Sequence, residues 1–177
     1  RTAEELAVLL QRLGDLSADE VTERSTGEGR AWLLELAARG RVVEAAIPTS
    51  TGAEARWVPA ELYGRYRVAF GLPADVAEWE GDEETEGADA ARRSILLAYL
   101  RGRAPRTLDQ IRARYAFAPQ GLEEALHEAV ETGDVVRGYL TPGAERTQWC
   151  DRAVLERIHR RTLSLLRKQI EPVALTA

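Results

Sequence analysis

The sequence predicts a mainly α-helical fold with small β-hairpins, of the α+β class, in which one arrangement of elements occurs twice. Apolar residues recur with helical spacing in the same order on both sides of a strongly acidic stretch, and each second predicted helix opens on a Ser/Thr-x-x-Glu/Gln signal. Each third helix ends at a glycine that is followed closely by two valines. The copies are about 92 residues apart, measured from Trp57 to Trp149.

Each copy begins with an amphipathic helix and continues with a capped one. The first helices are AEELAVLLQRLG, residues 3–14, and ARRSILLAYLRG, residues 91–102. The second helices open at Ser17, three residues before Glu20, and at Thr107, three residues before Gln110. In this spacing each side chain can satisfy a free backbone N–H of the other residue, so both positions are predicted helix starts.

Each third helix leads into a hairpin. The helices end at Gly40 and Gly133, where a left-handed C-terminal cap is expected, and the valine pairs that follow suit a strand. Turn residues and a return strand carrying a tryptophan come next: Pro48 to Gly52 before Trp57, and Thr141 to Gly143 before Trp149. Three helices, of which the second and third form a helix-turn-helix, closed by a hairpin, are typical of a winged-helix domain.

The chain therefore divides into four predicted segments. They are a winged-helix domain with a trailing helix at 1–73, an acidic linker at 74–89, a second winged-helix domain at 90–150, and a basic helix with a tail at 151–177. The linker holds eight acidic residues and no basic one, although the whole chain has a net charge of only -5. Without the linker, the rest of the chain is net positive, which suits a nucleic-acid partner.

Composition excludes several classes of protein. No apolar run approaches the roughly 18 residues of a membrane span and no signal peptide opens the chain, so we expect a cytoplasmic protein with no membrane partner. One cysteine cannot form an internal disulfide, and His127 and His159 have no zinc spacing, so we expect no bound metal. The chain starts at Arg1 and lacks methionine, so we expect it to be a piece of a longer protein.

The last predicted helix, Asp151 to Ile170, has one apolar and one basic side. At about 100° per residue, the apolar side holds Val154, Leu155, Ile158, Leu165 and Leu166. The opposite side holds Arg157, Arg160, Arg161, Arg167 and Lys168. We expect the apolar side to pack and the basic side to bind DNA phosphates; the alternative is a solvated arginine face that keeps the helix soluble.

The third helices of the two copies differ in charge. The first offers Arg30, Arg39 and Arg41 for contact with a DNA groove. The second has no lysine or arginine and is predicted to be repelled by DNA; its acids are Glu123, Glu124, Glu128 and Glu131. The second copy is therefore expected to brace neighbouring domains, or to reach DNA through its wing or through Arg101, Arg103, Arg106, Arg112 and Arg114.

The sequence offers no catalytic or cofactor-binding residue. Cys150 is interpreted as a small buried apolar residue rather than a nucleophile, because His159 lies more than two turns along the same helix. Asp151 suits the N-cap of that helix. A phosphate-binding loop is absent, since the only lysine, Lys168, precedes a glutamine.

The run GDVVRGYLTPGAERTQWCDRAVLERIHRRTLSLLRKQIEPV, from Gly133 to Val173, resembles the part of large helicase-related (Lhr) proteins beyond the helicase motor. In that family a G-x-[VL]-x-x-G-x-[FL]-x-P-G segment leads to W-C-D and then to an arginine-rich helix ending in E-P-V. The matching positions here are Gly138, Pro142, Gly143, Trp149, Cys150, Asp151, Arg157, Arg160, Arg161, Arg167, Glu171, Pro172 and Val173. RWVPAELYGRYRVAFG, residues 56–71, resembles the segment that joins consecutive winged helices in the family.

The resemblance implies a fragment of an ATP-dependent helicase that translocates on single-stranded DNA and acts in DNA repair, with ATP and magnesium in the motor of the parent protein. It also implies tandem winged helices arranged as in a class of bacterial DNA glycosylases. No family catalytic residue maps onto this chain.

Three functions follow as hypotheses. The main one is a non-motor segment that binds single-stranded or forked DNA and holds neighbouring domains of the parent chain. The second is a protein-docking module that uses the acidic second winged helix. The third is part of a winged-helix DNA glycosylase.

Overall fold

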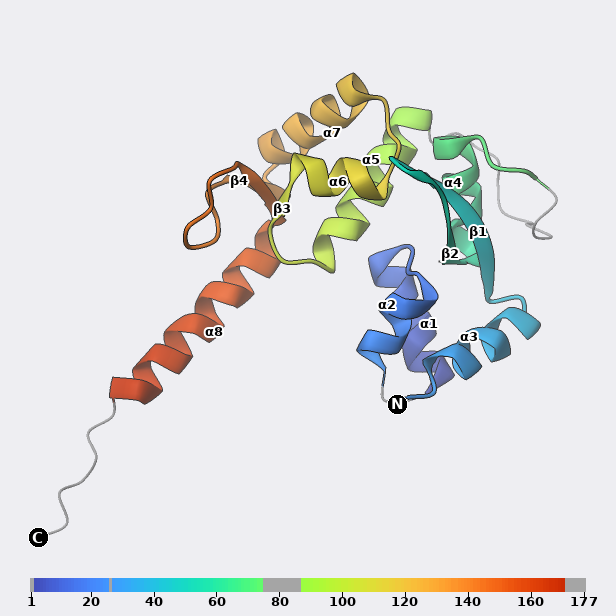
Figure 1. Cartoon of the computed structure of the whole chain (residues 1–177), viewed down its shortest axis with the longest axis horizontal. Helices are drawn as coiled ribbons and strands as arrows, with labels where there is room; N and C mark the ends of the chain where they lie inside the picture. Colours follow the sequence, from blue (N-terminus) through green and yellow to red (C-terminus); the bar gives the residue numbers. More distant parts are fainter. Residues whose placement is uncertain (1, 26, 75–86, 171–177) are drawn as a thin grey trace, which may run out of the picture.

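The computed structural model describes residues 2–25, 27–74 and 87–170. The first unit, at the blue end of Figure 1, consists of α1 (Ala3–Leu13), α2 (Ala18–Arg24), α3 (Gly29–Ala38), β1 (Val42–Thr49), β2 (Gly52–Pro59), the 3-10 turn η1 (Ala60–Leu62) and α4 (Tyr63–Phe70). The second unit consists of α5 (Ala88–Arg101), β3 (Arg106–Thr107), α6 (Leu108–Arg114), α7 (Pro119–Glu131), β4 (Val135–Gly138), β5 (Gln148–Asp151) and α8 (Arg152–Ile170). The fold is α+β with winged-helix character, as predicted. Most of the predicted acidic linker, residues 75–86, lies outside the described residues, as does the E-P-V end.

The helix-capping interactions that the sequence predicts are present in the structure. In α2 the Glu20 backbone N–H donates to Ser17 Oγ at 3.2 Å, and the Ser17 N–H donates back to the Glu20 carboxylate at 3.0 Å. Thr107 and Gln110 form the same reciprocal pair at the start of α6. After the third helices, Gly40 and Gly133 have φ of 66° and 79°, the left-handed conformation that glycine adopts without steric cost.

The two tryptophans occupy equivalent places in the two small sheets. Trp57 on β2 pairs with Glu44 on β1 and forms a bridge with Leu16, the residue before the α2 cap. Trp149 on β5 pairs with Arg137 on β4 and with Arg106 on β3, the residue before the α6 cap. Each hairpin is thus closed onto the segment that precedes its second helix.

The two units share one apolar core. Ile47 and Val58 of the first hairpin are fully buried in a cluster that also holds Leu96 of α5 and Tyr115 beside α6. The backbone joins them too, because the N–H of Ala116 donates to the carbonyl of Pro48 at 3.0 Å. In Figure 1 the turn of the first hairpin points toward the end of α6 in the second unit. The first hairpin is therefore a packing element and not an exposed wing.

Helix α8 departs from the prediction that its whole apolar side packs. Val154 and Leu155 are 7% and 8% exposed, in a small cluster with Cys150. Further along, Ile158, Leu165 and Leu166 are 37%, 55% and 48% exposed. The reason is geometric: only the first turn lies over the second sheet, and the rest projects away from the body (Figure 1). The prediction of a packed apolar face is wrong beyond the first turn.

Candidate nucleic-acid interface

The start of α8 is anchored by the Trp-Cys-Asp motif. The carboxylate of Asp151 accepts a hydrogen bond from the backbone N–H of Val154 at 3.0 Å, which confirms the predicted N-cap. Cys150 is fully buried, and its burial, followed by the charge of Asp151, raises its pKa to about 11. The thiol is therefore protonated at neutral pH, as expected of a packing residue.

The cationic face of α8 is exposed and unpaired. We use this name for Arg157, Arg160, Arg161, Arg167 and Lys168. At about 100° per residue they span an arc of about 120°. All five side chains are exposed, and none forms an ion pair with a carboxylate in the described parts of the chain. Cations without intramolecular partners are free to contact phosphates.

The arginines in and after α3 that were predicted to contact DNA, unlike those of α8, lie beside carboxylates. Arg30 pairs with Asp19 at 3.2 Å, Arg39 pairs with Glu35 at 2.7 Å, and Arg41 lies 3.6 Å from a Glu4 oxygen. Each guanidinium thus has a carboxylate from its own unit beside it. A DNA phosphate would have to compete with that carboxylate, which weakens the case for these three positions.

The acids of α7 also have partners within the second unit. Glu123 pairs with Arg112 at 2.7 Å and Glu128 pairs with Arg93 at 2.9 Å. Arg101 lies 4.0 Å from the Asp151 carboxylate. The structure therefore ties Arg101 and Arg112, two of the predicted alternative DNA contacts, to nearby carboxylates.

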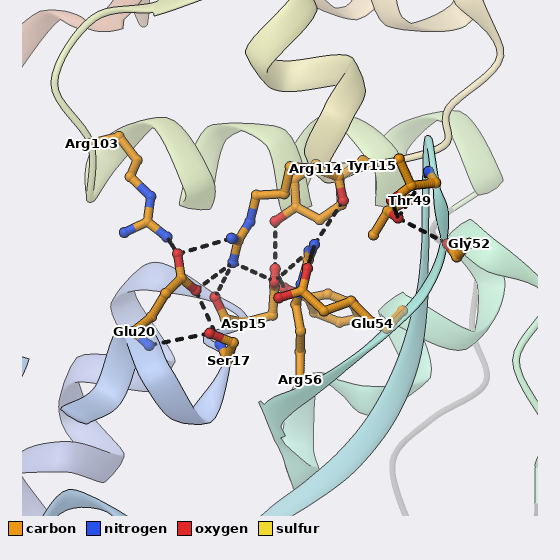
Figure 2. Close-up of polar contacts among 12 residues, drawn as sticks. Asp15, Ser17, Glu20, Thr49, Gly52, Glu54, Arg56, Arg103, Arg114 and Tyr115 are labelled. Carbon is orange, nitrogen blue, oxygen red and sulfur yellow. Dashed lines mark hydrogen bonds and ion pairs between the residues drawn. The ribbon is translucent and has the colours of Figure 1, made fainter. Parts of the chain in front are cut away.

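A buried ion cluster that no sequence pattern indicated joins the two units. We call it the inter-unit cluster (Figure 2); it consists of Asp15, Glu20, Glu54 and Arg56 with Tyr66 from the first unit, and Arg103, Arg114 and Tyr115 from the second.

Asp15 is the centre of the cluster. Its side chain is fully buried, and its carboxylate lies 3.0 Å from the Arg56 guanidinium and 2.7 Å from that of Arg114. The hydroxyl of Tyr66 donates to it at 2.9 Å, and that of Tyr115 donates to the same oxygen. A buried carboxylate is tolerated only with such partners, so Asp15 holds both units through one side chain.

The remaining members complete the charge balance. Arg114 also lies 3.0 Å from Glu20, which accepts from Arg103 as well. Arg56 pairs with Glu54 at 2.6 Å and donates to the backbone carbonyl of Arg114 at 2.9 Å. Three guanidinium groups thus meet three carboxylates in the space between the units.

Burial controls the protonation of this cluster. It raises the pKa values of Tyr66 and Tyr115 well above their ordinary value, and the charge of Asp15 adds to the effect. Both hydroxyls therefore stay protonated and can donate. Burial alone would lower the pKa of Arg114, but the negative charges of Asp15 and Glu20 raise it, so this guanidinium stays charged.

The cluster changes the role of two predicted DNA contacts. Arg103 and Arg114 are 7% and 10% exposed at their side chains and are committed to Glu20 and Asp15. Arg106 is half-buried on β3. Asp15 has its partners 41 to 100 residues further along the chain, so no local pattern could identify it.

Neither a metal site nor a membrane span is found in the part of the chain that the structure describes. No group of three or more histidine, cysteine, aspartate or glutamate residues there could hold a metal ion. No helix within the same residues is long and apolar enough to cross a membrane.

Comparison with known proteins agrees with this architecture. Residues 1–81, which include α1 to α4, match the family model of the winged-helix domain of the large helicase-related protein. Over its whole length the chain is 32% identical to a Mycolicibacterium smegmatis protein described as "Lhr helicase/ probable uracil glycosylase". The chain belongs to the Lhr family. The chain spans 11% of the length of that relative.

Proposed function

We propose that this Lhr segment binds DNA through the cationic face of α8, and that two winged-helix domains, locked by the inter-unit cluster, form the rigid base of that helix. The observation that carries the proposal is the contrast in pairing. The arginines of α3 and of the inter-unit cluster have carboxylates beside them, whereas the five cations of α8 are exposed without one in the described residues.

The projecting shape of α8 supports the proposal. A helix held only at its first turn, by Val154, Leu155 and the Asp151 cap, leaves its later turns open to a strand along the cationic face. Each phosphate contact would add about 0.9 to the salt dependence of duplex binding and about 0.7 for a single strand. We therefore expect affinity to fall steeply as salt rises.

The second half of the proposal is scaffolding. The shared apolar core and the inter-unit cluster make the two units one body, which can hold the relative positions of neighbouring domains in an Lhr protein. The acidic α7 suits this role better than DNA contact, since phosphates would be repelled by its four glutamates.

The relative's description names a helicase, and we infer that this segment contributes DNA binding to an ATP-dependent helicase that acts in DNA repair in the cytoplasm. ATP and magnesium would act in a motor elsewhere in such a protein. The segment itself is proposed to be non-catalytic.

Fluorescence anisotropy tests the DNA half of the proposal. Labelled single-stranded, duplex and forked DNA are titrated with the 177-residue chain at several salt concentrations. The double variant Arg160→Gln/Arg161→Gln is compared with the matched control Arg30→Gln/Arg39→Gln. We expect the α8 variant to bind more weakly and with a shallower salt slope, and the control to bind as the unmodified chain does.

Equal losses in both variants would point to diffuse charge rather than to α8. Absence of salt-sensitive binding to all three DNA forms would leave only the scaffolding role.

A further inference from the structure

Tyr139 is exposed, whereas every other tyrosine is buried. It lies just after β4, in the loop of the second hairpin, and is 70% exposed. The other four are 6% exposed or less: Tyr63, Tyr66, Tyr99 and Tyr115. Tyr139 is also the most exposed large apolar side chain in the described residues.

The loop that carries Tyr139 is held in place. The side-chain oxygen of Gln148, on β5, accepts hydrogen bonds from the backbone N–H groups of Leu140 and Thr141, both at 3.1 Å. Gly138, on the other side of Tyr139, pairs with Gln148 in the β4–β5 ladder. Because the backbone on both sides is fixed, a partner of the tyrosine ring would not have to order this loop on binding.

A cation without a carboxylate partner lies close to this tyrosine in sequence. The guanidinium of Arg137 lies 5.6 Å from the ring centre of Trp149. No ion pair links it to a carboxylate in the described parts of the chain, and the side chain is exposed. Proteins that bind single-stranded nucleic acids combine exposed aromatic rings with cations that no carboxylate neutralises, and Tyr139 and Arg137 provide one of each at the end of β4.

The hairpin is also packed against α8. Val136 and Leu140, which flank Tyr139, contact the cluster formed by Cys150, Val154 and Leu155. In Figure 1 the β4–β5 loop lies beside the first turns of α8. The loop that carries Tyr139 therefore lies next to the first turn of α8, about one turn before the cationic face begins at Arg157.

We propose that Tyr139 stacks on an unpaired base of DNA held by α8, and that this contact makes the segment prefer single-stranded or forked DNA over duplex. The inference rests on the proposed function of α8. The physical reason for the preference is access: in a duplex each base face is covered by its neighbours, whereas an unpaired base can leave its stack and lie on an aromatic ring.

The experiment compares Tyr139→Ala, Tyr139→Phe and the matched control Leu34→Ala, which removes a side chain that is 65% exposed on α3. Anisotropy gives the affinity for an oligo-dT strand and for a duplex of the same length. A second strand carries 2-aminopurine, whose fluorescence falls when it stacks. Thermal melting checks that each variant is folded.

We expect Tyr139→Ala to bind the single strand about tenfold more weakly, with duplex affinity unchanged. The fall in 2-aminopurine fluorescence should be lost in Tyr139→Ala and kept in Tyr139→Phe and Leu34→Ala. Single-strand affinity unchanged in Tyr139→Ala, or equal losses on both forms of DNA, would overturn base stacking.

The same titration separates this inference from the function on which it rests. If the unmodified chain binds DNA with a salt slope that depends on Arg160 and Arg161, but Tyr139→Ala changes nothing, only the inference fails. If the unmodified chain binds no DNA, both fail.

Discussion

Arginine has two opposite roles in this chain. In the inter-unit cluster, Arg56 and Arg114 are at most 10% exposed and lie within 3.0 Å of Asp15. On α8, arginines of the same chemistry are exposed and unpaired among the described residues. The environment of an arginine therefore decides its role: buried guanidinium groups with carboxylate partners hold domains together, and exposed groups without them are available to a ligand.

The largest expected effect comes from removing the centre of the cluster. Asp15→Ala leaves two buried guanidinium groups without their shared carboxylate, and we expect the free energy of unfolding to fall by about 3–5 kcal/mol. Urea denaturation measures it. The control Glu35→Ala removes an exposed carboxylate from an i,i+4 pair and should cost about 0.5 kcal/mol or less. Similar losses in both variants would contradict a central role for Asp15.

A smaller effect is expected at high pH. An unfolded tyrosine ionises near pH 10, whereas burial keeps Tyr66 and Tyr115 protonated in the folded chain. Stability from these groups is therefore complete below pH 10 and is lost as pH rises further, by ~1.4 kcal/mol per pH unit for each tyrosine.

Urea denaturation from pH 9 to 11 checks the sign and the slope. Tyr66→Phe should remove the contribution of one tyrosine and so make the fall shallower, while the contributions of Cys150 and Tyr99 remain in both proteins. A slope that is the same with and without Tyr66 would show that this hydroxyl is not shielded in the folded chain.

A third prediction contrasts two leucines of α8. Leu155 is 8% exposed in the cluster with Cys150, so Leu155→Ala should lower the unfolding free energy by about 2 kcal/mol. Leu166 is 48% exposed, and Leu166→Ala should change it by about 0.5 kcal/mol or less. Chemical denaturation of the two variants tests how far along α8 the packing extends. Equal losses would mean that the later turns are also packed in solution.

The smallest effect on stability is expected at the cationic face itself. Arg160→Gln/Arg161→Gln should leave the unfolding free energy within about 0.5 kcal/mol, because both side chains are exposed. The same variant should reduce the salt slope of duplex binding by up to about 1.8. Substitutions on the cationic face of α8 would thus change DNA binding without changing the unfolding free energy, whereas Asp15→Ala in the inter-unit cluster changes the unfolding free energy. A large loss of stability would contradict the comparison.

Much of the fold was predictable because its signals are local. The capping boxes at Ser17 and Thr107, and the left-handed glycines at Gly40 and Gly133, act over three or four residues and could be identified twice. The equivalence of Trp57 and Trp149 followed from that repetition. The Asp151 cap and the burial of Cys150 were likewise confirmed.

The candidate site was only partly predictable. The helical wheel identified which side of α8 is cationic, but it also predicted a packed apolar face that is absent beyond Leu155. Periodicity shows that two faces of a helix differ in polarity, but it does not show whether a neighbouring element covers one of them. It could not show either that Arg39 would also lie beside Glu4, 35 residues earlier in the chain.

The sequence by itself determined the repeated order of helices and strands, the helix ends and the cationic side of α8, since these depend on residues a few positions apart. Only the tertiary structure decided which arginines are free, because Asp15 meets Arg56, Tyr66, Arg114 and Tyr115 across 41 to 100 residues of chain. Charge pairing depends on distance in space, and folding alone brings these groups together.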